Sequence, residues 1–248
     1  MLQYIYQFAA KGLKLMKETI CTIPINDVFG PKDGCPICRL HDMLEQNYLD
    51  YILGPAMMEP DIRVETNEKG FCTKHFHMMV NKGRRLQNAL ILETHLDNIK
   101  NTLIDENAKG KPDKKNIAAL EQLQQSCYVC DKISWGMEHM FRTIFSSFTT
   151  DPEFKELFEQ QPFICLPHYT MLIKSASSKG GLKGSELSEF YKSASKLSGR
   201  YLNTLKDDIS HYCKMFDYRS NGQDWGNSKD SIERSVEYLT SEKPDYIE

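Results

Sequence analysis

The chain has 248 residues, of which 40% are apolar and 26% are charged, and its formal net charge at pH 7 is -3. This composition is ordinary for a soluble globular protein, and the slightly acidic balance argues against a nucleic-acid-binding role, which usually requires a strongly basic surface. No apolar run approaches the ~18 residues that a membrane helix needs, and the N-terminus lacks the pattern of a secretory signal. We therefore expect a cytoplasmic protein without membrane association.

The N-terminal segment, residues 1–32, contains the only strand-like pattern of the chain. Residues 20–25 alternate in polarity, although Pro24 cannot donate a backbone hydrogen bond to a sheet. We expect a short extended stretch here.

The first helical repeat, residues 33–108, opens with the motif Cys-Pro-Ile-Cys at positions 35–38. Apolar residues recur at helical spacing over 40–52, so a helix is expected to start at this motif. A shorter helix is expected over residues 60–68.

The same repeat continues with the motif Cys-Thr-Lys-His at 72–75, which starts another helical stretch. A glycine-containing break at 81–85 precedes a long helix. The apolar stripe of this helix, which we expect to be buried, consists of Ala89, Leu92, Leu96, Ile99 and Leu103.

A linker and helix start, residues 109–124, lead to the second helical repeat, residues 125–216. The motif Cys-Tyr-Val-Cys at 127–130 opens a helix with apolar spacing as far as Phe148. A short helix over 152–160 follows, and Thr150 with Glu153 forms a capping-box pattern at its start.

The motif Cys-Leu-Pro-His at 165–168, a break at 177–185 and a long helix complete the second repeat. The apolar stripe of this helix consists of Leu187, Tyr191, Ala194, Leu197, Tyr201, Leu205, Ile209 and Tyr212. In the C-terminal segment, residues 217–248, Asn227 or Ser228 can cap a last helix that ends near Leu239.

The two repeats carry the same four-residue pattern, with matching positions 92, 92, 93 and 93 residues apart. The chain is therefore predicted to be all-α, a pseudo-symmetric tandem repeat of a helical unit. Three thiolates and an imidazole form a closed tetrahedral set for zinc, because soft sulfur donors suit the ion and four donors leave no open position. The positions near helix N-termini favour thiolates.

Each repeat is predicted to hold one Zn²⁺, which gives two ions per chain. The first ligand set consists of Cys35, Cys38, Cys72 and His75, and the second consists of Cys127, Cys130, Cys165 and His168.

The remaining cysteines and histidines have no partners in the repeat. Cys21 lies outside both sets, and Cys213 is expected in the core beside Tyr212 and Phe216. His77, two positions after a ligand, is a candidate for a hydrogen bond to the ligand shell. No catalytic or cofactor-binding motif is found.

Several stretches resemble a known bacterial family. The run TIPIND, followed by CPIC, GFC, CYVC, ICLPH and the tail DWG, is similar to the domain of unknown function 6062 over about Met16 to Leu239. Residues 1–15 lie outside the resemblance, which implies a bacterial cytoplasmic origin but does not supply a function.

The expected function is that of a non-enzymatic interaction or regulatory protein with structural zinc. A protein partner is expected, and its identity, like the oligomeric state, is open. A zinc-thiolate redox or metal sensor is one alternative, and an enzyme with a pocket between the repeats is another.

Overall fold

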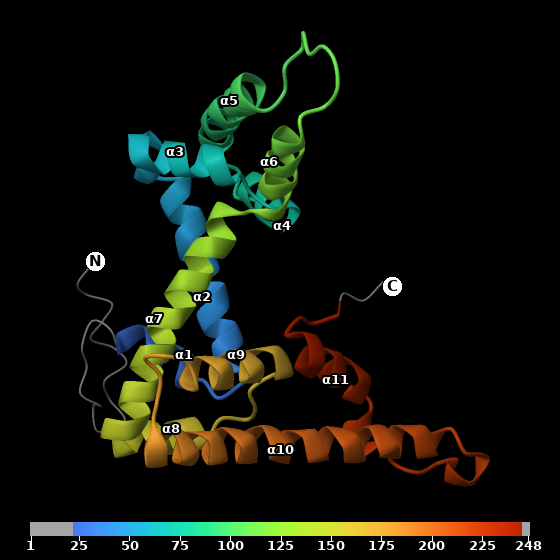
Figure 1. Cartoon of the computed structure of the whole chain (residues 1–248). Helices are drawn as coiled ribbons and strands as arrows, with labels where there is room; N and C mark the ends of the chain where they lie inside the picture. The colour runs from blue at the N-terminus through green and yellow to red at the C-terminus, as the bar shows by residue number, and fades with distance from the viewer. Residues whose placement is uncertain (1–21, 245–248) are drawn as a thin grey trace. The chain divides into compact units, whose positions relative to one another are not determined.

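A computed structural model describes residues 22–244 of the chain and shows an all-α protein (Figure 1). Eleven α-helices and three 3-10 helices make up the regular structure of these residues, which contain no β-strand. Within the same range, every helix is too short or too polar to cross a membrane. The all-α prediction is confirmed.

The chain divides into two compact units, which are described separately below. Unit 1 takes its described residues from 22–40 and 140–244, and unit 2 consists of His41–His139. Both boundaries fall inside helices, because α2 (Pro36–Ile52) and α7 (Tyr128–Thr150) each contribute to both units. Each sequence repeat therefore supplies residues to both units.

Unit 2 contains most of α2, the 3-10 helix η1 (Pro55–Met58), four further helices and the first half of α7. The four helices are α3 (Pro60–Lys69), α4 (Thr73–Asn81), α5 (Arg85–Thr102) and α6 (Lys114–Gln125). Helix α5 packs against α3 and α4. A Cβ atom at Gly136 of α7 would lie 3.2 Å from side-chain atoms of Leu44 and Tyr48, so glycine permits the close approach of α7 to α2.

Unit 1 contains the start of α2, the end of α7 and five further α-helices. These are α1 (Ile23–Phe29), α8 (Pro152–Glu159), α9 (Leu166–Ala176), α10 (Gly184–Met215) and α11 (Ser231–Thr240), with the 3-10 helices η2 (Tyr218–Ser220) and η3 (Gly226–Ser228) before α11. Helix α10 packs against α8, α9 and α11.

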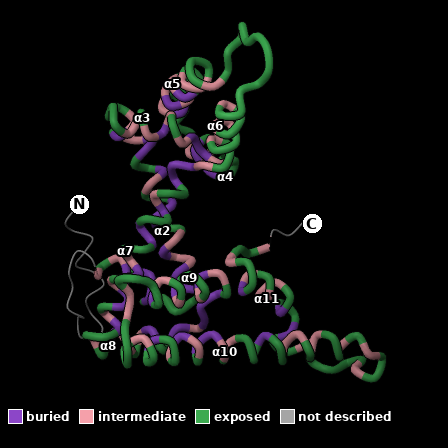
Figure 2. Tube along the Cα trace, viewed as in Figure 1, coloured by how far each residue is buried: buried purple, intermediate pink, exposed green. Residues whose placement is uncertain are grey.

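Phenylalanine rings fill the core of unit 1, with centroids of neighbouring rings 5.0–5.9 Å apart. Figure 2 shows the buried positions along the chain. The rings belong to Phe29, Phe148, Phe154, Phe158 and Phe190.

The short helices predicted over 60–68 and 152–160 are confirmed as α3 and α8. The predicted cap of α8 is wrong by one residue. The Asp151 carboxylate, rather than the Thr150 hydroxyl, accepts hydrogen bonds from the backbone N–H groups of Glu153 and Phe154. Thr150 still belongs to α7, and its hydroxyl donates to the Ser146 carbonyl.

The prediction of an extended N-terminal stretch is wrong for Ile23–Ile25, because these residues begin α1 and Pro24 occupies its first turn. Proline is favourable there because the first helical N–H groups have no intrahelical acceptor. Residues 20–21 lie outside the described range. The predicted cap of the last helix, Asn227 or Ser228, is wrong, because both residues belong to η3 and the helix starts at Ser231.

The predicted buried stripes are only partly correct. On α5, Leu96 is 61% exposed, and the buried face carries Asn88, Ile91 and His95. The Asn88 amide donates to the Met79 carbonyl, so its burial leaves no unpaired donor there. On α10, Ala194, Leu197 and Leu205 are buried as predicted, whereas Tyr191 is 52% exposed and Phe190 is buried in its place. Cys213 is exposed, so its assignment to the core is wrong.

Candidate metal centres

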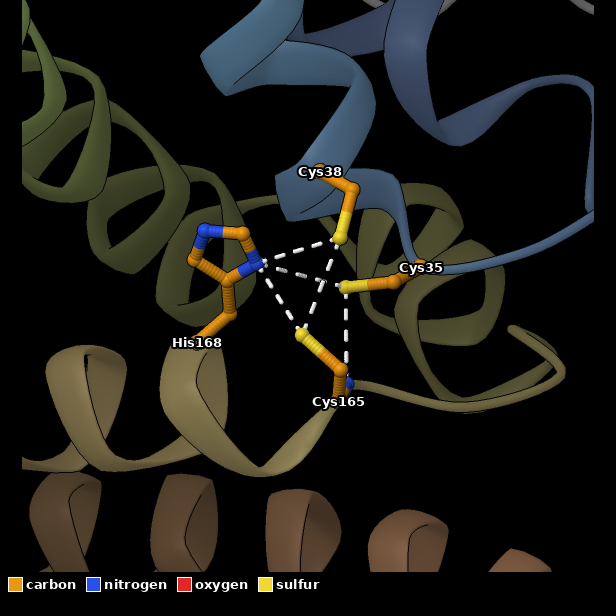
Figure 3. A group of neighbouring side chains, drawn as sticks. All are labelled: Cys35, Cys38, Cys165 and His168. Atoms are coloured by element: carbon orange, nitrogen blue, oxygen red, sulfur yellow. Dashed lines mark hydrogen bonds between the residues drawn. The ribbon is translucent and has the colours of Figure 1, made fainter. Parts of the chain in front are cut away.

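The first cluster, defined as Cys35, Cys38, Cys165 and His168, lies in unit 1 where the start of α2 meets the start of α9 (Figure 3). Cys35 directly precedes α2 and Cys38 lies in its first turn. Cys165 is the N-cap of α9, and His168 lies in the first turn of that helix.

The geometry of the first cluster fits a tetrahedral ion. Donor atoms about 2.0–2.3 Å from a tetrahedral zinc lie about 3.5–3.8 Å from one another. The His168 Nδ1 atom lies 3.2 Å from the Cys38 Sγ, 3.1 Å from the Cys165 Sγ and 3.9 Å from the Cys35 Sγ, and the Cys38 and Cys165 sulfurs are 3.7 Å apart. All four donor atoms lie within 4.8 Å of one another, so this cluster could hold a metal ion.

The second cluster, defined as Cys72, His75, Cys127 and Cys130, lies in unit 2. Cys72 is the N-cap of α4 and His75 lies in its first turn, whereas Cys127 and Cys130 flank the start of α7. The His75 Nδ1 atom lies 3.2 Å from the sulfurs of Cys72 and Cys127 and 3.4 Å from that of Cys130. This cluster has the same donor set and a comparable size.

The predicted grouping of the ligands within each repeat is wrong. Each cluster combines the C-x2-C motif of one repeat with the C-x2-H motif of the other. The length of α2 favours this arrangement, because its 17 residues carry the chain about 25 Å from Cys35, and the ten residues of α3 alone return it by at most about 15 Å. In the structure the C-x2-H motif that follows lies in unit 2 with Cys127 and Cys130, whereas the cysteines at the start of α2 lie in unit 1.

The placement of the cysteines at helix starts agrees with the sequence analysis. Unpaired N–H groups and the helix dipole favour negative charge at these positions. One such interaction is direct, because the backbone N–H of Cys165 donates to the Cys35 Sγ at 3.5 Å.

The three thiols of the first cluster differ in pKa, so they differ in how readily each becomes a thiolate. Burial raises the pKa of the Cys35 thiol, but hydrogen bonds involving Cys165, Cys38 and His168 lower it by more, so its pKa lies well below the ordinary value. The hydrogen bond with Cys35 raises the pKa of Cys165 to about 12, and hydrogen bonds with Cys165 and Cys35 raise the pKa of Cys38. One thiolate therefore keeps its neighbours protonated until a cation offsets the repulsion.

In the second cluster, burial raises the pKa of the Cys127 and Cys130 thiols. Burial lowers the pKa of His75 despite the nearby Glu45 carboxylate, so the imidazole is neutral at neutral pH. A neutral imidazole has a free lone pair for a metal.

Glu45 determines which nitrogen of His75 carries the proton. Its buried carboxylate lies 3.0 Å from the His75 Nε2, opposite the Nδ1 that faces the three sulfurs. The Nε2–H therefore donates to Glu45, and Nδ1 is left as the metal-facing donor. His77, the residue that the sequence suggests for such a role, is exposed. The burial of Glu45 could have been inferred from its position four residues before the buried Leu49, because residues at this spacing lie on the same helix face.

His41, Asp42 and Glu45 also lie close enough to share an ion. The Lys74 ammonium is 2.7 Å from the Glu45 carboxylate and places positive charge where that ion would bind. We therefore assign Glu45 to the second cluster and assign no third ion.

The comparisons with known proteins point to one family. The model of a family of unknown function, DUF6062, matches residues 16–246. The chain belongs to this family. A protein of Caldicellulosiruptor sp. (strain Rt8B.4), described as an uncharacterized 23.9 kDa protein in the xynA 3' region, is 26% identical over 148 residues, which cover 59% of this chain and 69% of that protein. No solved structure matches.

Proposed function

We propose that this protein binds two zinc ions, one in each cluster, and that both ions are structural. The observation that carries the proposal is the convergence of eight side chains from four separate motifs into two complete sets of three sulfurs and one imidazole. Sulfur-rich tetrahedral sets favour zinc over harder ions such as Mg²⁺ or Ca²⁺. The two ions would join helix starts that lie far apart in the sequence.

A closed set of four protein donors favours a non-enzymatic role, because catalytic zinc usually keeps a position for water or substrate. The protein would then act by presenting its folded surface to a protein partner. The six ligand thiols must stay reduced, which fits the cytoplasmic location that the sequence predicts.

Metal analysis tests the zinc proposal directly. Protein purified without chelators is expected to contain two zinc ions per chain, and Cys72→Ser or Cys165→Ser is expected to lose one of them. Cys213→Ser is the matched control, because this exposed cysteine belongs to neither cluster. A parent protein without bound metal would refute the proposal, and X-ray absorption that detects a water ligand on either ion would favour the enzymatic alternative.

We further propose that the two repeats arose by duplication. The helix order supports this proposal, since α2, α3, α4 and α5 correspond in order to α7, α8, α9 and α10, with the ligand motifs at the starts of equivalent helices. The expected result is that an experimental structure of the chain superposes these two sets of helices. Different helix directions in the two sets would contradict duplication.

A further inference from the structure

The two clusters differ in their access to solvent. In the second cluster Cys130 is exposed and Cys72 is partly exposed. In the first cluster Cys35, Cys165 and His168 are buried and only Cys38 is partly exposed. The backbone carbonyl of Ser241, at the end of α11, lies 3.9 Å from the Cys38 sulfur and limits access to it.

We propose that the second cluster is a peroxide-sensitive modification site, in which Cys130 and Cys72 form a disulfide and the metal ion is released. This proposal rests on the proposed metal binding. The two sulfurs lie 3.9 Å apart, and neighbouring thiols of which one is solvent-exposed are the usual arrangement in redox-sensitive sites.

The reaction begins at Cys130, because its sulfur is the donor most accessible to hydrogen peroxide. The Cys130 thiolate attacks one peroxide oxygen, the O–O bond breaks, and hydroxide leaves, so that Cys130 becomes a sulfenic acid. The Cys72 thiolate then attacks the Cys130 sulfur, an S–S bond forms and the S–O bond breaks. In total, two thiolates, one peroxide and two protons give one disulfide and two water molecules.

The ion leaves because the reaction removes two of its four donors. Only Cys127 and His75 remain, and zinc in proteins is held almost always by three or four protein ligands. In the first cluster, the sulfurs of Cys38 and Cys165 are equally close, 3.7 Å apart, but they are less accessible, because Cys165 is buried and Cys38 is only partly exposed. Access, and not the distance between sulfurs, therefore determines which cluster reacts first.

Stepwise oxidation of the zinc-loaded full chain tests the proposal. Hydrogen peroxide is added while a zinc-sensitive dye records release, and peptides are mapped by mass spectrometry without reduction. The expected result is early release of one ion per chain together with a peptide pair that joins Cys72 to Cys130. Simultaneous release of both ions, release from the first cluster before the second, or early release without that linked pair would overturn the proposal.

Matched variants distinguish the effect of the solvent-exposed Cys130 thiol from the effect of weaker metal binding. Cys130→His keeps a fourth donor but removes the exposed thiol, and is expected to slow the early release. Cys213→Ser removes an exposed thiol that belongs to neither cluster, and is expected to leave the early release unchanged. Equal early rates in Cys130→His and the parent would contradict the proposal, and if Cys130→His holds only one ion the parent peptide map decides alone.

Failure of the modification site and failure of the proposed metal binding give different results. A parent protein that holds no zinc before oxidation refutes metal binding itself. A parent that holds two ions and releases neither under peroxide refutes only the modification site.

Discussion

The first and second clusters have the same donors in equivalent sequence positions but different surroundings. Three of the four donors of the first cluster are buried and the fourth lies beneath the end of α11, whereas Cys130 of the second cluster is exposed. The repeated motifs determine the coordination chemistry, and the elements around them determine access. A repeated ligand pattern can therefore place one donor set in a shielded environment and the other in an accessible one.

The hydrogen-bonding environment differs in the same way. Glu45 orients His75 of the second cluster, and the equivalent position in the other repeat, 92 residues later, is the buried Met137. Only one of the two repeats therefore has a carboxylate at this position. A change at Glu45 is expected to affect the second cluster and not the first.

The largest expected difference concerns loss of a ligand. Cys165→Ser is expected to unfold unit 1, because structural zinc contributes about 10–16 kcal/mol in small peptides and a typical domain is stable by only about 5–15 kcal/mol. Cys72→Ser is expected to loosen unit 2 with a smaller effect, since its cluster is more exposed. Hydrogen exchange with zinc counting distinguishes the units, with Cys213→Ser as the control. If each ligand variant loses an ion yet exchanges like the parent, the structural role of zinc is excluded.

Acid is expected to release both ions. In the metal-free protein the raised pKa of Cys38, Cys127, Cys130 and Cys165 keeps these thiols protonated at neutral pH. Metal binding therefore displaces protons, and affinity falls as the pH falls. Calorimetric zinc titration in two buffers of different ionisation enthalpy would measure the displaced protons. Equal heats in both buffers would contradict this account.

A smaller effect is expected at Glu45. Glu45→Gln keeps an oxygen acceptor but removes the negative charge beside His75, and loss of such a partner typically weakens metal binding about 10–100-fold. Competition with a chelator of known affinity should show this loss at the second cluster only. Asp42→Asn, an exposed change three residues earlier on the same helix, should bind zinc like the parent. A Glu45→Gln protein with parental affinity would remove the role of this carboxylate.

The sequence was sufficient to predict the all-α class, the short helices at Pro60 and Pro152, and the eight candidate ligands. Repeated spacing identifies which residues are equivalent, and apolar periodicity identifies helices. Neither property indicates which C-x2-C motif lies beside which C-x2-H motif in space. The crossed pairing of the motifs therefore could not be predicted from them. The length of α2, 17 residues that begin at the first C-x2-C motif, favours that pairing.

Buried polar residues were the second feature that could not be predicted from the sequence. Asn88 and His95 occupy the buried face of α5 because both side chains hydrogen-bond to backbone carbonyls. Glu45 is buried for a similar reason, since Lys74 and His75 bind its carboxylate. A polarity pattern predicts all three as solvated, because the partners come from other helices.

Zinc counting in two double variants tests the crossed clusters most directly. Cys35→Ser with Cys165→Ser removes two donors from the first cluster alone, so one zinc ion per chain is expected to remain. Cys35→Ser with Cys72→Ser removes one donor from each cluster, so neither ion should survive dialysis against a chelator that leaves the parent loaded. The reverse result, with no ion in the first variant and one in the second, would contradict the crossed pairing and favour a site within each repeat.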